Sequence, residues 1–230
     1  MKLRTIDYEN ITHVFFDLDN TLWDSIANKK LALRAVYDEF ALSNLFGFDD
    51  FSVKFDEANH QFHLGILENN SARTLTRFDF LFLSSPALEN YNKREMEVVY
   101  NRELSSQNTL LPYTEEVLDY LHSKYDLNLI VNGSYASAQK KLVSANLKGY
   151  FNRIYSALDL GHPKPSPKTY ELAINELNIL PENSLMIGDN YNKDLAGAEK
   201  VNMKILLLNR WKGPAKCAKI NELKELKTLL

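Results

Sequence analysis

Two aspartates near the start of the chain have the types and spacing of a reactive pair. Asp17 and Asp19 stand two residues apart at the end of a short apolar run. A carboxylate can attack phosphorus as a nucleophile, and a second carboxyl group can donate a proton to the departing oxygen and later accept one from water. The same acidic turn is also typical of a helix start capped by Asp24 or Ser25. By itself the pair indicates this chemistry without deciding it.

A turn of small residues follows a second apolar run. It contains Asn132, Gly133 and Ser134, ahead of a helical pattern. A strand that ends in such a turn before a helix presents free backbone N–H groups, which suit the oxygens of a phosphate. Taken alone, this segment is better explained as an ordinary connection between a strand and a helix.

Lys164 lies among prolines. Pro163, Pro165 and Pro167 surround it and stiffen the chain around its ammonium group. A rigidly held ammonium can bind a carboxylate nucleophile and a phosphoryl group together as a point charge. The alternative is a solvated lysine in a proline-rich loop, with Pro167 starting the next helix.

Two further aspartates follow a third apolar run. Asp189 comes directly after Gly188, and Asp194 lies about one helical turn further on. Mg²⁺ prefers a few carboxylates together with waters and phosphate oxygens, so Asp17 and Asp189 are its expected carboxylate ligands. The alternative is that Asp189 caps a helix and Asp194 is a surface acid.

The elements that must position these groups alternate between strand and helix. Short apolar runs predict strands at 13–16, 127–131, 154–156, 185–187 and 204–208. Helical patterns lie between them at 113–124, 134–146, 167–177 and 193–200. This alternation predicts an α/β fold, a Rossmann-like parallel sheet with helices on both faces. Each reactive segment follows a predicted strand, so all four are expected to meet beyond the carboxyl ends of the strands.

A long segment after the first predicted strand interrupts this alternation. It contains one helical pattern after another and no convincing strand. We therefore predict an all-α insertion at 23–104, within an α/β core formed by 1–22 and 105–230.

Two pairs of residues in the insertion have spacings that could serve a ligand. His60 and His63 lie three residues apart, and Arg73 and Arg77 lie four apart. Because no third metal ligand is evident, ordinary histidines are the favoured interpretation. A solvated helix face is favoured for the two arginines.

The composition is that of an ordinary globular protein. Among 230 residues, Lys+Arg number 27 and Asp+Glu 30, for a formal net charge of −3. The sequence has no stripe of basic residues, so a polymeric nucleic acid is not expected as a partner. The single cysteine, Cys217, can form no intramolecular disulfide. No apolar run has the length of a membrane span, and the polar start lacks the pattern of a signal peptide, so we expect a soluble cytoplasmic protein.

The order of the four reactive segments resembles that of the haloacid dehalogenase superfamily of hydrolases, in the form that carries a helical cap after the first motif. The resemblance covers nearly the whole chain. Within the superfamily the chain is most similar to the YjjG-like branch, which includes nucleoside 5′-monophosphatases. That placement rests on the Asn132-Gly133 pair, the Asp189-Asn190-Tyr191 run and the length of the cap. The resemblance implies a Mg²⁺-dependent phosphatase that hydrolyses small phosphate monoesters through an aspartyl-phosphate, beneath a cap that closes over the site.

The resemblance also implies a role for each reactive side chain. Asp17 is the nucleophile and a Mg²⁺ ligand, and Asp19 is the general acid and base, whose backbone carbonyl also binds the metal. Lys164 pairs with Asp17 and the phosphoryl group. Asp189 is the second carboxylate ligand, and Asp194 belongs to the metal site by orienting bound water or Lys164.

One position departs from the family pattern. Asn132 and Gly133 are implied to contact the phosphoryl group, but the Thr or Ser that usually precedes them is Val131 here. Ser134 can replace the missing hydroxyl if the turn directs it to the site. Because loss of one such donor costs roughly a hundredfold in rate, a slow phosphatase and a low-turnover protein that binds a phosphorylated ligand both stay open.

Two other chemistries of the family bear on the same residues. A phosphosugar mutase stays open, because Asp19 can return the phosphoryl group to a bound sugar. A 2-haloacid dehalogenase uses an aspartate nucleophile without Mg²⁺ or the second aspartate, so Asp19 argues against it. The sequence names neither the substrate nor the oligomeric state.

Overall fold

The chain divides into two compact units, each with its own hydrophobic core. The computed structural model describes residues 8–68 and 75–230. One unit is formed by Met1–Ser25 with Asn108–Leu230, and the other by Ile26–Gln107. Arg73 and the side chain of His63 lie outside the described residues.

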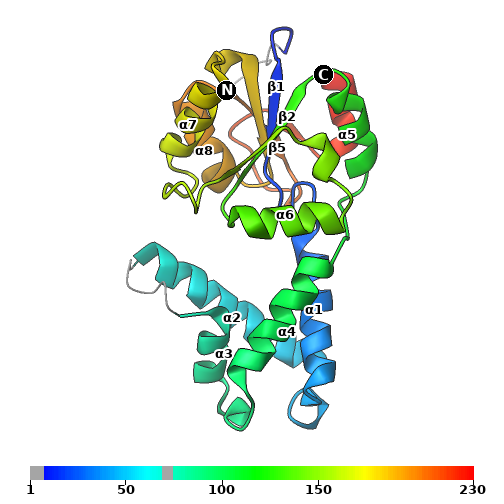
Figure 1. Cartoon of the computed structure of the whole chain (residues 1–230), viewed down its shortest axis with the longest axis vertical. Coiled ribbons are helices and arrows are strands. Elements are labelled where there is room, and N and C mark those ends of the chain that lie inside the picture. Colours follow the sequence, from blue (N-terminus) through cyan, green and yellow to red (C-terminus); the bar gives the residue numbers. More distant parts are fainter. Residues whose placement is uncertain (1–7, 69–74) are drawn as a thin grey trace. The chain divides into compact units, whose positions relative to one another are not determined.

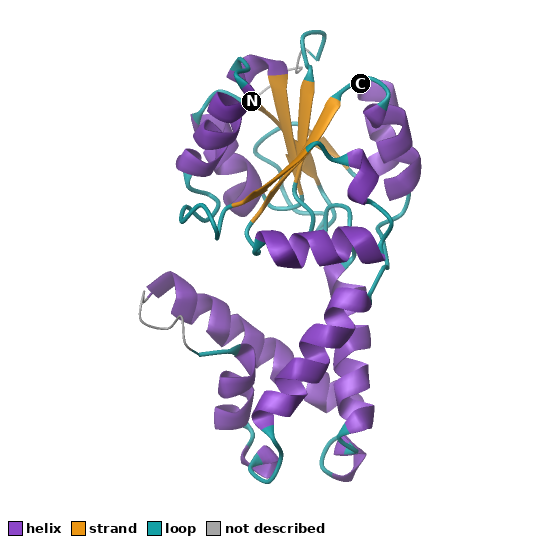
Figure 2. Ribbon diagram, in the orientation of Figure 1, coloured by secondary structure: helices purple, strands orange, loops and turns teal. Residues whose placement is uncertain are grey.

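The first unit is built on a parallel sheet (Figure 2). In the described part of the chain, six strands pair in the order β3-β2-β1-β4-β5-β6, and every pairing is parallel. The strands are β1 (His13–Phe16), β2 (Asp126–Val131), β3 (Arg153–Ser156), β4 (Ser184–Gly188), β5 (Lys204–Leu208) and β6 (Lys219–Ile220). Their short apolar sequences fit strands that are covered on both faces.

Helices lie on both faces of this sheet (Figure 1). They are α5 (Thr114–His122), α6 (Tyr135–Ser144), α7 (Pro167–Leu177), α8 (Ala196–Lys200) and α9 (Leu226–Leu229). Phe15 and Met186 of the sheet share one core cluster with Tyr170 and Ile174 of α7 and Ala198 of α8. The predicted α/β fold with a parallel sheet is confirmed, while β6 and α9 were not predicted.

The register of the central strands decides where the site forms. Phe16 at the end of β1 lies opposite Leu129 of β2 and Ile187 of β4. The residues that follow these three strands therefore emerge at the same edge of the sheet. The strand order also reverses direction beside β1, which is the place where open α/β sheets bind ligands.

The second unit is helical in its described residues. Its helices are α1 (Ser25–Glu39), α2 (Phe48–Glu68), α3 (Arg77–Ser84) and α4 (Lys93–Ser106). Phe51, Phe55, Phe78 and Tyr100 lie in its buried core. The Arg77 guanidinium lies 5.4 Å from the centre of the Tyr100 ring, so this arginine packs against the unit's own aromatic residues. Among the described helices of the whole chain, none is both long and apolar enough to cross a membrane.

Candidate active site

Asp17 continues the line of β1 into the site. Its backbone N–H donates to the carbonyl of Ile187 in β4 over 2.9 Å, which extends the sheet by one residue. The residue is only 7% exposed. The Thr21 hydroxyl donates to its Oδ2 over 3.5 Å. Asp17 is therefore a buried carboxylate at a rigid strand end.

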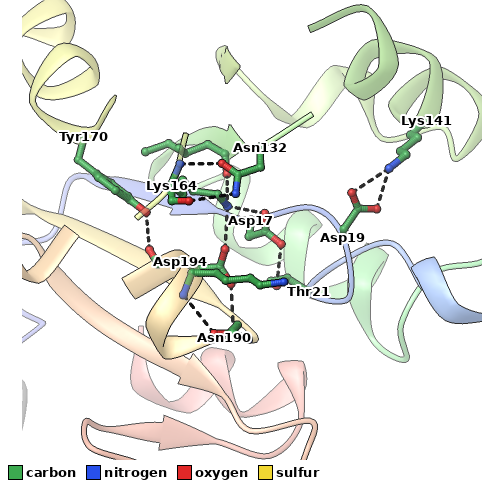
Figure 3. A network of polar contacts seen from close by, with 11 residues as sticks. Asp17, Asp19, Thr21, Asn132, Lys141, Lys164, Tyr170, Asn190 and Asp194 are labelled. Carbon is green, nitrogen blue, oxygen red and sulfur yellow. Dashed lines mark hydrogen bonds and ion pairs between the residues drawn. The ribbon is translucent and has the colours of Figure 1, made fainter. Parts of the chain in front are cut away.

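Lys164 is the centre of a buried network of polar contacts (Figure 3). Its Nζ donates to Asp17 Oδ1 over 2.6 Å, to Asp194 Oδ1 over 2.8 Å and to the Ile130 carbonyl over 2.9 Å. The side chain is 1% exposed. The interpretation of Lys164 as a solvated loop residue is therefore wrong, and the lysine bridges two buried carboxylates.

Asn132 holds the backbone of Lys164. Its Oδ1 accepts from the Lys164 N–H over 2.7 Å, and its Nδ2 donates to the Lys164 carbonyl over 3.3 Å. In this structure both ends of the Asn132 amide group thus bind the backbone of Lys164. Contact of Asn132 with a phosphoryl group stays a prediction.

Asp194 is presented by a widened helical turn. Tyr191–Leu195 forms a π-helical turn that leads into α8. Asp194 Oδ2 accepts from the Asn190 N–H over 3.0 Å, and the Asp194 carbonyl accepts from the Tyr170 hydroxyl over 2.6 Å. Gly188 makes room for this turn, because a Cβ at Gly188 would lie 2.6 Å from the Asp194 Cβ. Asp194 is buried, so its interpretation as a surface acid is wrong.

Three carboxylates gather in a small space. Within the described residues, Asp17, Asp189 and Asp194 each offer an oxygen, and these atoms all lie within 4.8 Å of one another. Asp189 Oδ2 also accepts from the indole N–H of Trp211 over 2.8 Å. When all three are ionised, their three negative charges exceed the one positive charge of Lys164 by two. Oxygen donors and this excess charge both fit a hard divalent cation such as Mg²⁺.

The protonation behaviour of these groups follows from burial and crowding. Burial, together with the neighbouring Asp194 carboxylate, raises the pKa of Asp189 to about 6, although the Trp211 hydrogen bond lowers it. Burial likewise raises the pKa of Asp17 above its ordinary value, while Lys164 opposes the shift. Burial alone lowers the pKa of Lys164, but Asp17 and Asp194 raise it by more. The lysine therefore stays charged at neutral pH.

Asp19 lies apart from this buried cluster. Its two carboxylate oxygens accept from Lys141 Nζ over 2.7 and 2.9 Å, and Figure 3 shows this pair separate from the contacts around Lys164. The Asp19 side chain is 46% exposed. Sequence reasoning missed Lys141, which belongs to α6 and carries no motif of its own.

The loop after Asp19 is fixed by side chains of the same unit. Asn20 adopts a left-handed conformation with φ of 62°. Its Oδ1 accepts from the Ser25 hydroxyl over 3.0 Å, at the first residue of α1. Asp24 pairs with Arg210 over 2.9 Å. These contacts anchor the loop that follows the two aspartates.

The turn after β2 places Ser134 at a helix start. Its Oγ accepts from the Ser137 N–H over 3.2 Å and caps α6. The Gly133 carbonyl accepts from the Ser156 hydroxyl over 2.8 Å, and Val131 is buried. These contacts hold the turn in place, and phosphate binding by Gly133 and Ser134 stays a prediction.

Comparison with known proteins identifies the family. The model of the haloacid dehalogenase-like hydrolases matches residues 11–202, which is most of the chain. The chain belongs to this family. It is accordingly an enzyme, and the matched residues of this haloacid dehalogenase-like hydrolase include Asp17, Asp19, Lys164, Asp189 and Asp194.

Individual proteins resemble most of the chain. Glyceraldehyde 3-phosphate phosphatase from Methanothermobacter thermautotrophicus is 25% identical over 85% of this chain and 84% of that protein. Pyrimidine 5′-nucleotidase PynA from Streptococcus pneumoniae is 27% identical over 85% and 83%. The crystal structure of the HAD-hydrolase YfnB from Bacillus subtilis, bound to magnesium, has a TM-score of 0.80 and 22% identity, and covers 96% of this chain and 98% of that chain. YfnB shares the fold of this hydrolase.

Proposed function

We propose that this hydrolase is a Mg²⁺-dependent phosphatase that acts on small phosphate monoesters through an aspartyl-phosphate. The observation that carries the proposal is the buried contact of Lys164 with both Asp17 and Asp194, beside Asp189. This arrangement places a nucleophilic carboxylate, a fixed positive charge and a set of oxygen donors at the same edge of the sheet, where the strands end. Phosphoryl transfer depends mainly on positioning and on stabilising negative charge, which these groups supply.

Each of these residues has its own role in the two steps of the proposed reaction. Asp17 attacks the phosphorus, a P–O bond to the aspartate forms, and the bond to the leaving oxygen breaks. Asp19 gives that oxygen a proton. Water then attacks the phosphorus of the acyl-phosphate, Asp19 takes the proton from the water, and the bond to Asp17 breaks to release inorganic phosphate. Lys164 balances negative charge throughout.

The acidic cluster would hold the metal ion. Asp17 and Asp189 are the proposed carboxylate ligands, together with the Asp19 backbone carbonyl, and Asp194 supports the cluster through Lys164. When bound, Mg²⁺ neutralises charge on phosphoryl oxygens. The function of the helical unit as a cap over the site stays a prediction.

The substrate class is a small phosphorylated molecule. Nucleoside 5′-monophosphates and sugar phosphates are the first candidates, because the relatives of this hydrolase include a pyrimidine 5′-nucleotidase and a glyceraldehyde 3-phosphate phosphatase. The test is phosphate release from a panel of both kinds, with and without Mg²⁺. Isomerised sugar phosphate in place of free phosphate would identify a mutase, and ligand-dependent stabilisation without phosphate release would identify a binding protein.

Mg²⁺ is expected to stabilise the protein through Asp189. An ion that binds only the folded state adds about 2.7 kcal/mol to the free energy of unfolding at a hundredfold excess over its dissociation constant. Asp189→Asn removes one charged ligand and should shrink this gain, measured by urea denaturation with and without Mg²⁺. Asp50→Asn changes an exposed aspartate of α2 and should leave the gain intact. An equal gain in wild type and Asp189→Asn would exclude Asp189 as a ligand.

Val131→Thr is expected to raise the turnover number. The substitution adds a hydroxyl at the end of β2, next to the turn that precedes α6. One transition-state donor is worth roughly a hundredfold in rate, so a gain on the order of tenfold is expected after imperfect placement. Steady-state kinetics on the best substrate of the panel measures it, with Val131→Ala as the control that adds no donor. Equal rates in Val131→Thr and wild type would mean that the missing hydroxyl does not limit the reaction.

A further inference from the structure

Lys141 is held from two sides, next to the proposed general acid and base. Its Nζ contacts both Asp19 oxygens, over 2.7 and 2.9 Å. The same atom lies 4.4 Å from the centre of the Trp23 ring, which is fully buried. The Lys141 side chain is 13% exposed, against 46% for Asp19. The lysine is thus the fixed member of the pair.

We infer that Lys141 is a positioning residue that fixes the orientation of the Asp19 carboxyl group for proton transfer. The inference rests on the proposed phosphatase function. Proton transfer needs a carboxyl group within hydrogen-bond reach of the leaving oxygen, and a half-exposed aspartate has several rotamers available. Charge-assisted contacts to both oxygens remove that freedom.

The Lys141–Asp19 pair differs from an ordinary surface ion pair. Exposed pairs contribute little, because two mobile side chains must be ordered in water. Here the lysine already lies against the Trp23 ring, an attraction that acts on its charge independently of Asp19. The Trp23 contact therefore already offsets part of the entropy cost of ordering the Lys141 side chain. The ion pair has then to order only the Asp19 side chain.

The role predicts a dependence on the leaving group. An alkyl alkoxide needs a proton to depart, whereas para-nitrophenolate departs readily as an anion. Lys141→Met keeps the length of the side chain and its packing on Trp23 but removes the ammonium. We expect kcat/KM to fall about tenfold for an alkyl phosphate of the panel, a fraction of the roughly 10²–10⁴ that general acid catalysis supplies, and to fall much less for para-nitrophenyl phosphate.

Three variants sharpen the test. Lys141→Arg keeps the charge and should restore part of the activity on the alkyl phosphate. Lys140→Met changes the exposed neighbour on α6 and should leave the ratio of the two kcat/KM values at the wild-type level. Asp19→Asn should show the same leaving-group dependence, and adding Lys141→Met to it should cost little more, because the lysine then has no carboxylate to orient.

The outcomes separate this inference from the function on which it rests. Equal losses on both substrates, or full additivity with Asp19→Asn, in an enzyme whose wild type releases phosphate would overturn the role of Lys141 alone. No phosphate release by the wild type from any substrate would overturn the proposed function, and the inference with it.

Discussion

Asp17→Asn is expected to reduce phosphate release by about 10⁴-fold or more, since removal of a nucleophile eliminates the covalent route. The amide is nearly the same size and can still accept from Lys164, so the site keeps its shape. Phosphate release from the best substrate of the panel measures the effect. Asp50→Asn, on an exposed face of α2, is the matched control and should keep wild-type turnover.

The same substitution should leave the protein at least as stable when divalent ions are chelated. Burial raises the pKa of Asp17, which means that the folded state disfavours its charged form. An acid whose pKa is raised on folding lowers the free energy of unfolding once the pH exceeds the pKa of that acid in the unfolded state. This loss of stability grows as the pH rises, and it is present at neutral pH. Asn carries no charge and avoids it. Urea denaturation in EDTA tests this, and either near-normal turnover or a large drop in stability for Asp17→Asn would contradict the assignment.

Lys164→Met is expected to lower the free energy of unfolding by about 3–5 kcal/mol, because it leaves buried carboxylates without their counter-charge. The lysine donates to both Asp17 and Asp194, and all three side chains are at most 10% exposed. Turnover should fall with it. Lys168→Met, which changes an exposed lysine on α7, is the control and should change stability by no more than about 0.5 kcal/mol.

A second variant separates charge from packing at Lys164. Adding Asp17→Asn to Lys164→Met removes one of the two stranded carboxylates, so part of the lost stability should return. If the double variant is no more stable than Lys164→Met, loss of packing, and not stranded charge, explains the effect. Urea denaturation of the four proteins of this cycle, in EDTA, gives the coupling.

The parts of the structure that depend on local pattern were predictable from the sequence. β1 and α7 have the predicted bounds. The apolar run of β1 is enough to indicate a strand, and the amphipathic pattern of α7, which begins at a proline, is enough to indicate a helix. The four segments of the site follow predicted strands, and parallel pairing brings strand ends together. The two-residue strand β6 has too short a pattern to detect.

Side-chain partners could not be read from the sequence in the same way. Asn132 and Lys164 are far apart in the chain, and the amide's hold on the Lys164 backbone depends on how two loops meet. In the sequence, nothing distinguishes Lys141 from other lysines in helical patterns. Its contact with Asp19 is evident only in the folded structure. Trp211 reaches Asp189 from the loop after β5. Such partnerships follow from tertiary structure, which gives a residue its neighbours.

The π-helical turn that carries Asp194 makes the site sensitive to the length of the chain as well as to its composition. Such a turn holds one residue more than an α-helical turn. Losing that residue would rotate the rest of the helix by about 100° around its axis, since an α-helix has 3.6 residues per turn. Asn192 and Lys193 are exposed, so their side chains are free to vary over evolution. The number of residues in the turn is not free to vary in this way. We therefore expect related chains to show substitutions here but no insertions or deletions.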